Sequence, residues 1–563
     1  MARFDTVIKG GTIFDGMRTP RYVGDIGIRD GVIEAIGGID AADADQVIDA
    51  DGLHVAPGFV DLHTHYDSQV YWDPWCTISG YHGVTSVAIG NCGFGFAPVK
   101  PEDRERSMQT MTRNEAVPLE SMQAGMPWDW ETFPEFLDSI ERTPKGVNII
   151  SYVPLNPLMA YVMGVEAAKG RPANDEERAE LHRLMREALD AGACGWSGQL
   201  TDAEMEVQRD FDGSPMITNL MTEDDLIAFA EVLRDAGRGL IQCIGASQEL
   251  TEKLAEASGR PILWNVLALF ADQHGNPQVP YKDTIAWLHD ANARGLRLYA
   301  QALTVENDFQ FTLEDWNLFD TVEVWREVLM GDVEQRRANL LNEDNRRRIR
   351  DAFDAGAPML ALTDDLLVGI VHEPDLKEIE GYTVGEIAQI RDCHVVDAFI
   401  DVALEDNMRA LFITPPRPAD NEAMSQVIHC DVSLPGVSDG GAHTKFLTHG
   451  RYPTEFLALL CRDNELMDLE QAHWRLSAYP AQAAGITDRG WIREGAPADI
   501  IVYDLDELHV GEPERAWDFP AGAWRLVQRP RGYRYIMVNG EVTFRNGECT
   551  GATPGSLLRH GSA

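Results

Sequence analysis

Two histidines separated by one residue, His63 and His65, are the first side chains in the sequence whose types and spacing suit metal chemistry. They follow an apolar stretch, residues 58–62, that has the character of a β-strand. Because residues i and i+2 of a strand point to the same side, the two imidazoles would project together. Converging imidazoles suit a divalent metal such as zinc. A His-x-His pair alone is a weak signal, and its place at the end of a strand strengthens the prediction.

A second candidate ligand, Cys92, lies in a glycine-rich turn after another apolar strand within residues 83–95. A thiolate in this turn would reach a metal held by the two histidines. The alternative is a thiol buried in a tight turn, because unpaired cysteines are most often small core residues. Residue types alone leave both interpretations open.

A carboxylate, Asp439, ends a late strand in residues 436–443. Here it would ligate the metal and accept a proton from the water that the metal activates. The alternative is a helix N-cap before a glycine turn, but the two histidines favour catalysis. His443, four residues further on, is a candidate for substrate contact. Arg451, just after His449, would pair with a substrate carboxylate.

Apolar strands that alternate with helical segments position these residues from residue 58 onward. Strands with no alternation, each followed by a helix, form a parallel sheet. About eight such units predict an α/β fold with a TIM-like (β/α)8 barrel, whose C-terminal mouth would carry the ligands. The expected strands are residues 58–63, 85–89, 147–153, 194–197, 240–244, 261–267, 296–300 and 432–438, and the clearest helices are 175–191, 224–235 and 249–257.

Both ends of the chain have a different, all-β character. The dipeptides Asp30-Gly31 and Asn539-Gly540 are turn signals of β-hairpins. We therefore expect a small β-sandwich domain built from residues 1–57 and 482–563, and a metal-dependent barrel of residues 58–481. The long charged stretch 305–430 is interpreted as an elaborated insertion over the barrel mouth.

Charge and composition limit the partners. The 563 residues include 48 Lys and Arg against 91 Asp and Glu, which gives a net charge of −43. This excess of acid argues against binding to nucleic acid or to anionic membranes, which need a basic face. We expect a cytoplasmic protein, because no signal peptide or membrane span is recognisable and the eight cysteines form no CxxC pair. Assembly into a homo-oligomer stays open.

Together these motifs resemble the amidohydrolase superfamily, and most of all its N-acyl-D-amino-acid deacylase (D-aminoacylase) group. The resemblance covers nearly the whole chain, and the Asn-Cys-Gly-Phe turn at residues 91–94 separates this group from hydantoinases and dihydroorotases, which use a carbamylated lysine. It implies zinc and attack of an activated water on an amide carbonyl. Carried over by position, it makes His63, His65, Cys92 and Asp439 metal ligands, and Asp439 also the catalytic base and acid. Further matching segments are residues 72–74, 161–164, 492–499 and 550–555.

The sequence departs from that group at three strand ends. The group places histidines on the fifth and sixth strands, whereas residues 240–245 and 262–266 contain none, and Leu155 replaces the usual histidine of the third. We therefore expect one divalent metal per chain and a hydrolase that cleaves a linear, non-peptide amide of the N-acyl-D-amino-acid type. The alternatives are the same fold acting on a cyclic amide, a lactam or another C–N or C–C bond, and a non-catalytic relative that binds a small ligand.

Overall fold

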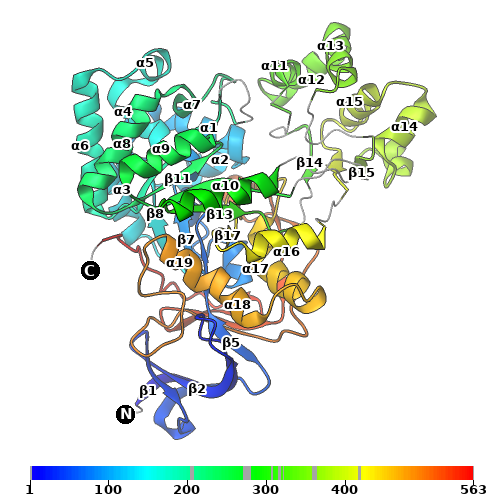
Figure 1. The fold of residues 1–563 in the computed structure, drawn as a ribbon. Helices are drawn as coiled ribbons and strands as arrows, with labels where there is room; N and C mark the ends of the chain where they lie inside the picture. The colour runs from blue at the N-terminus through cyan, green and yellow to red at the C-terminus, as the bar shows by residue number, and fades with distance from the viewer. Residues whose placement is uncertain are drawn as a thin grey trace.

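The chain has three parts, a β-sheet near the termini, a central body of parallel strands and helices, and an insertion that projects from that body (Figure 1). The fold is therefore α/β, as the sequence predicts. The computed structural model describes residues 3–202, 208–269, 280–305, 309–314, 319–320, 322–357, 364–415 and 420–561.

A nine-stranded sheet joins strands from both ends of the chain. Its order is β25-β24-β23-β18-β5-β1-β2-β3, with β4 also paired to β1. The predicted hairpins are confirmed, because Arg29 pairs with Val32 and Val538 pairs with Glu541 across their turns. The strands are β1 (Phe4–Ile13), β2 (Tyr22–Arg29), β3 (Val32–Gly37), β4 (Ala44–Asp49), β5 (His54–Pro57), β18 (Ile500–Tyr503), β23 (Tyr533–Val538), β24 (Glu541–Arg545) and β25 (Glu548–Cys549).

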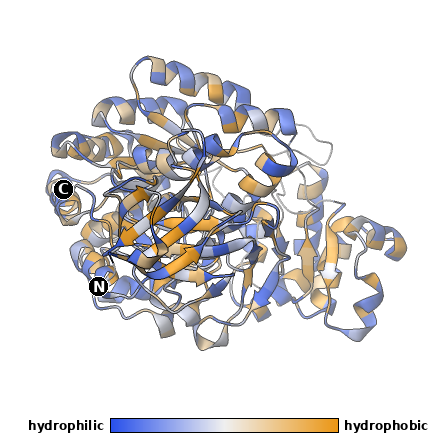
Figure 2. Ribbon diagram, turned by 90° about the horizontal axis from the view of Figure 1, so that it is seen from below, coloured by the Kyte–Doolittle hydropathy of each residue, from blue (hydrophilic) through white to orange (hydrophobic). Residues whose placement is uncertain are grey.

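All the predicted strands of the central body are present. Several of them, such as β7 and β10, are buried at every position, which is typical of parallel strands covered on both faces. Figure 2 shows hydrophobic strands surrounded by helices whose residues alternate in hydropathy. The strands are β6 (Phe59–Asp61), β7 (Val84–Ile89), β8 (Asn148–Ser151), β9 (Val153–Pro154), β10 (Gly195–Gln199), β11 (Leu240–Ile244), β12 (Ile262–Leu267), β13 (Leu298–Ala302) and β17 (Ser433–Pro435).

These strands form two parallel sheets, β6-β7-β8 and β17-β13-β12-β11-β10-β9. Only Tyr152 separates β8 from β9, and its N–H donates to Ile89 at the end of β7. At the other edge, Thr64 and Gly440 form a parallel bridge between the residues that follow β6 and β17. The carboxyl ends of β6, β7 and β17 are thereby close together.

Helices of the body follow the strands in turn. Predicted helix 175–191 is confirmed as α6, which begins with a capping box between Asn174 and Glu177 and ends at Gly192 in the left-handed conformation. The helices are α1 (Arg104–Glu115), α2 (Leu119–Gly125), α3 (Phe133–Arg142), α4 (Leu155–Met163), α5 (Val165–Gly170), α6 (Asp175–Ala191), α7 (Ile217–Leu220), α8 (Glu223–Ala236), α9 (Gln248–Ser258), α10 (Tyr281–Ala293), α16 (Asn421–His429), α17 (Tyr452–Glu455), α18 (Leu469–His473) and α19 (Tyr479–Ala483).

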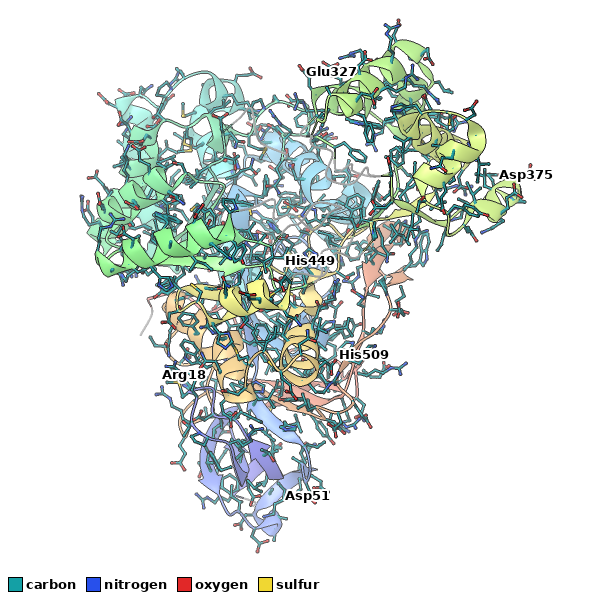
Figure 3. The ribbon with its side chains drawn as sticks, turned by 45° about the vertical axis from the view of Figure 1, so that its right-hand side comes forward. Arg18, Asp51, Glu327, Asp375, His449 and His509 are labelled. Carbon is teal, nitrogen blue, oxygen red and sulfur yellow. The ribbon has the colours of Figure 1, made fainter. Side chains whose placement is uncertain are left out.

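The insertion has its own three-stranded sheet and apolar core. Trp325 and Phe399 lie in this core, together with Phe446 and Ala116 from the central body. In Figure 3, Glu327 and Asp375 lie on the insertion, whereas His449 lies near the middle of the molecule. The elements are β14 (Gln310–Phe311), β15 (Leu367–Ile370), β16 (Leu411–Ile413), α11 (Glu323–Val328), α12 (Val333–Leu341), α13 (Glu343–Asp354), α14 (Val384–Arg391) and α15 (Val395–Glu405).

Two short antiparallel pairs complete the C-terminal region, β19 (His509–Val510) with β22 (Pro530–Arg531), and β20 (Glu514–Ala516) with β21 (Arg525–Val527). All eight cysteines are free thiols. Among the residues that the structure describes, no helix combines the length and the apolar character needed to cross a bilayer.

Candidate metal centre

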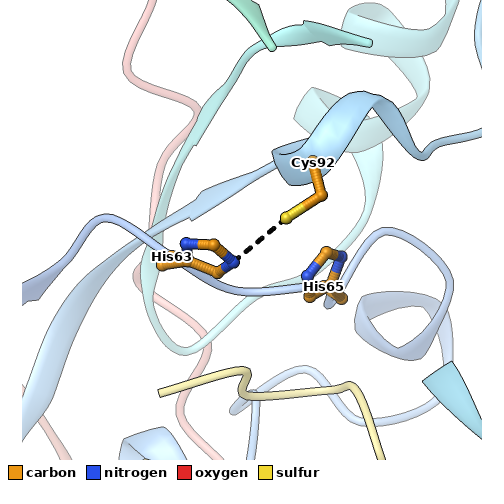
Figure 4. A group of neighbouring side chains, drawn as sticks. All are labelled: His63, His65 and Cys92. Carbon is orange, nitrogen blue, oxygen red and sulfur yellow. Dashed lines mark hydrogen bonds between the residues drawn. The ribbon is translucent and has the colours of Figure 1, made fainter. Parts of the chain in front are cut away.

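His63 and His65 follow β6 and are fixed by backbone hydrogen bonds on both sides. The Thr64 N–H donates to Ala88 at 3.2 Å, and the His65 N–H donates to Gly440 at 2.7 Å. Both imidazoles are buried and point toward the same space (Figure 4). The alternation of side chains expected of a strand therefore continues past the end of β6, because these hydrogen bonds hold residues 63–65 in an extended conformation.

Cys92 lies in the tight turn that follows β7. Its φ of 57° is in the left-handed region, which directs the turn back toward the histidines. The Sγ atom lies 3.3 Å from His63 Nε2. Single ligand atoms of His63, His65 and Cys92 all lie within 4.8 Å of one another, in a fully buried group that could hold a metal ion.

Asp439 brings a carboxylate to the same group. Its Oδ1 lies 3.2 Å from His63 Nε2 and 3.8 Å from His65 Nε2. Burial opposes the charge of Asp439, but the neighbouring imidazoles of His63, His443 and His65 outweigh it and hold the pKa of the carboxyl well below its usual range. Burial, with the adjacent His63, lowers the pKa of His65 to about 3. The carboxylate of Asp439 and the neutral imidazole of His65 are forms that bind metals. Burial opposes a charge on His63 too, but Cys92 and Asp439 outweigh it and raise the pKa of that imidazole, and burial raises the pKa of the Cys92 thiol.

Three buried amides line the space beside His63. Asn265 Nδ2 donates to His63 Nδ1 at 2.8 Å, and Gln301 Oε1 lies 3.4 Å from the same nitrogen. Gln242 joins this group by donating to Asn265 Oδ1 at 2.9 Å. These residues come from β12, β13 and β11, so the strands on which the sequence shows no histidine contribute amides to the site.

His443 lies at the second oxygen of Asp439, with its Nε2 4.0 Å from Oδ2. On its other side is Glu115, whose Oε2 lies 3.4 Å from the same nitrogen. Glu115 is completely buried at the end of α1, and burial together with Asp439 raises the pKa of its carboxyl. His443, the predicted substrate contact, therefore lies beside the centre with its Nε2 near the carboxyl groups of Asp439 and Glu115.

Arg451 does not join this group. Its guanidinium is buried and donates to Glu455 at 2.8 Å, and also contacts Thr448 and Gln528. His449 is buried beside it, and burial and Arg451 lower the pKa of this imidazole to about 3. This environment ties Arg451 to the protein itself, and its contact with substrate stays a prediction.

The sequence analysis did not identify Glu115, Gln242, Asn265 or Gln301. Gln242 and Asn265 lie in predicted strands, and a polar residue in an otherwise apolar strand is a signal that would have found them. Glu115 lies in the polar sequence of α1, where nothing distinguishes it from its exposed neighbours.

The chain is similar to known proteins along nearly its whole length. The sequence profile described as "Amidohydrolase family" matches residues 46–544. D-aminoacylase of Alcaligenes xylosoxydans xylosoxydans is 26% identical over 578 residues, which cover 100% of this chain and 98% of that protein. The structure of D-aminoacylase described as having a binuclear metal centre, with one-metal activation, has a TM-score of 0.67 at 21% identity and covers 99% of this chain and 100% of that one.

The same TM-score, identity and coverage hold for N-acyl-D-glutamate deacylase from Bordetella bronchiseptica, solved with zinc and a phosphonate inhibitor that mimics the tetrahedral intermediate. The chain therefore belongs to the amidohydrolase family. It is a hydrolase of carbon–nitrogen bonds other than peptide bonds, with the α/β fold of D-aminoacylase.

Proposed function

We propose that this protein hydrolyses the amide bond of an N-acyl-D-amino acid with one divalent metal, zinc, held by His63, His65, Cys92 and Asp439. The observation that carries the proposal is the convergence of two imidazoles, a thiol and a carboxylate in one buried space. The family and the substrates named for D-aminoacylase and N-acyl-D-glutamate deacylase support the reaction class.

The ligand set fits zinc in its chemistry and its spacing. Zinc prefers nitrogen and sulfur ligands at about 2.0–2.3 Å, so the ligand atoms of a tetrahedral site lie about 3.3–3.8 Å apart. The separations from His63 Nε2 are 3.3 Å to Cys92 Sγ and 3.2 Å to Asp439 Oδ1. On the opposite side of the space, Gln242 and Asn265 are occupied by hydrogen bonds to each other, which supports a single ion.

Asp439 is the group that moves protons in this proposal. When bound, the metal supplies polarisation of the amide carbonyl and activation of water. Asp439 takes the proton from the attacking water and delivers it to the nitrogen of the departing amine, which would otherwise leave as a poor amide anion. His443, 4.0 Å from Asp439 Oδ2, is placed to contact the substrate next to the scissile bond.

We also infer that the two parallel sheets form one closed (β/α)8 barrel with the metal centre at its carboxyl-terminal mouth. The hydrogen bond from Tyr152 to Ile89 and the bridge between Thr64 and Gly440 support this closure. Residues 1–57 and 482–563 would form the separate β-domain, since their strands share one sheet. The insertion would border the mouth, because Phe446 of the Asp439 loop lies in its core.

Purified protein tests the proposal in two measurements. Elemental analysis should find one zinc per chain, and removal of the metal with a chelator should abolish hydrolysis until zinc is restored. Release of free amine should be faster from N-acyl-D-amino acids than from their L-enantiomers, hydantoins or lactams. Two tightly held metals, none after loading with zinc, or a clear preference for the cyclic amides would contradict the proposal.

A further inference from the structure

Three amide side chains from three successive strands lie beside His63, and two of them, Asn265 and Gln301, face its Nδ1. Gln242, Asn265 and Gln301 are 0%, 2% and 1% exposed. A buried amide is stable only when its polar atoms have partners. Here the partners are one another, His63 and two backbone groups, so each amide has a defined orientation.

A backbone N–H fixes the direction of the first part of this network. The N–H of Cys92 can only donate, and it donates to Gln242 Oε1 at 2.8 Å. Gln242 must therefore turn its Nε2 toward Asn265 Oδ1, and Asn265 must turn its Nδ2 toward His63 Nδ1. The Cys92 turn and the His63 ring are thereby connected by a directed chain of hydrogen bonds.

A backbone carbonyl fixes the direction of the second part. The oxygen of Gly436 can only accept, and Gln301 Nε2 donates to it at 3.1 Å. Gln301 must therefore present Oε1, an acceptor, to His63 Nδ1 at 3.4 Å. One nitrogen of His63 thus faces a donor from Asn265 and an acceptor from Gln301.

These two neighbours favour opposite positions of the ring proton. A neutral imidazole has one N–H. Donation from Asn265 needs a bare Nδ1, which leaves the proton on Nε2, the nitrogen that faces Cys92 and Asp439. Metal binding through Nε2 needs the ring proton on Nδ1 instead. Of these amides, only Gln301 presents an acceptor to an N–H at Nδ1.

We propose that these amides set the metal affinity of His63, with Gln242 and Asn265 weakening it and Gln301 supporting it. The inference rests on the proposed metal-binding function. All three are positioning residues, because they act through the His63 ring and the Cys92 turn.

The decisive variants change affinity in opposite directions. In Gln242→Glu, the new carboxylate still accepts from the Cys92 N–H but can no longer donate to Asn265. Asn265 should then turn its Nδ2 toward this carboxylate and its oxygen toward His63 Nδ1. Zinc should then bind about 10–100-fold more tightly, the usual range for changes in the partner of a histidine ligand. Gln301→Met removes the acceptor and should weaken zinc binding by about the same factor.

The measurement is the zinc dissociation constant of the full chain, determined by competition with a chelator, with circular dichroism to confirm folding. The double variant Gln242→Glu, Asn265→Leu carries the same added charge without the amide that turns. It removes the Asn265 donor but offers His63 Nδ1 no new acceptor, so it should bind zinc less tightly than Gln242→Glu alone, which separates the gain of an acceptor from simple attraction. If Gln242→Glu does not fold, Asn265→Asp, which offers the ring a carboxylate oxygen, should tighten binding in its place.

Zinc binding in Gln242→Glu that is equal to or weaker than in the wild type, or binding in the double variant as tight as in Gln242→Glu alone, would overturn the inference. So would unchanged affinity in Gln301→Met. A wild-type chain that binds no zinc would instead contradict the proposed function, so the two failures are distinguishable.

Discussion

His63 and Cys92 follow short parallel strands, and amides from β11, β12 and β13 support them directly. Asp439 and His443 instead lie on the loop 439–451, whose position depends on distant segments. Thr444 bonds to Ala116 at 2.6 Å and accepts from the N–H of Leu526 at 2.7 Å. The carbonyl of Phe446 accepts from Gln310 of the insertion at 3.0 Å.

This comparison divides the centre into a strand side with His63 and Cys92 and a loop side with Asp439 and His443. It indicates that the two sides have different tasks. In the proposed function, the strand side supplies the nitrogen and sulfur ligands that favour zinc. The loop side has the proposed proton-transfer group Asp439 and the dyad of His443 and Glu115. Changes on the strand side should therefore act first on metal affinity, and changes on the loop side first on turnover.

Asp439→Asn should have the largest effect, because Asp439 is both a proposed metal ligand and the proposed proton-transfer group. Asparagine keeps the shape but can neither take up the proton nor supply the charge of the ligand. Loss of general acid–base catalysis alone should lower kcat by about 10²–10⁴-fold. Steady-state hydrolysis of an N-acyl-D-amino acid measures it. A variant that keeps more than about a tenth of wild-type kcat would show that the base lies elsewhere.

Cys92→Ser should sharpen the strand side of the comparison. Serine is nearly isosteric but is a poor zinc ligand beside a thiolate. We expect zinc affinity to fall by at least about 10–100-fold, the range for loss of an outer partner. Activity should return when excess zinc is added, and equilibrium dialysis checks the affinity. Unchanged affinity would mean that Cys92 is a core thiol.

Glu115→Gln should affect the loop side alone. The variant keeps the size of the side chain but replaces the carboxyl group that lies 3.4 Å from His443 Nε2 with an amide. We expect kcat to fall about tenfold, with zinc affinity unchanged. A loss of bound zinc in this variant would break the division between the two sides.

Arg451→Met should have the smallest effect on turnover and a clear effect on stability. It removes the ion pair with the nearly buried Glu455, and breaking a buried ion pair typically costs about 3–5 kcal/mol. Urea unfolding measures this loss, while kcat per folded molecule should stay close to the wild-type value. Preserved stability with a raised KM would support the sequence-based prediction that Arg451 contacts substrate.

The sequence predicts those parts of the site in which residues of metal-ligand type stand at the ends of recognisable strands. His63, His65 and Asp439 each end an apolar strand, and such ends meet at one edge of a parallel sheet. The strands and the terminal hairpins are found because apolar runs and Asn-Gly or Asp-Gly turns are local signals.

Long-range contacts left no such signal. Glu115 is buried because residues 443–444 pack against the end of α1, more than 300 positions away in sequence. Arg451 has the residue type of a substrate contact, yet Glu455 lies one helical turn further on and pairs with it. Spacing of four residues between opposite charges could have indicated that pair.

The dependence of the 439–451 loop on Leu526 has a consequence for synthesis of the protein. The N–H of Leu526 reaches Thr444 only after the ribosome has released residue 526. Strands β18 and β23, which continue the sheet begun by β1 and β5, also emerge late. His63 and Cys92 are therefore synthesised long before the segments that fix the proton-transferring loop, so this loop should be the last part of the centre to reach its place.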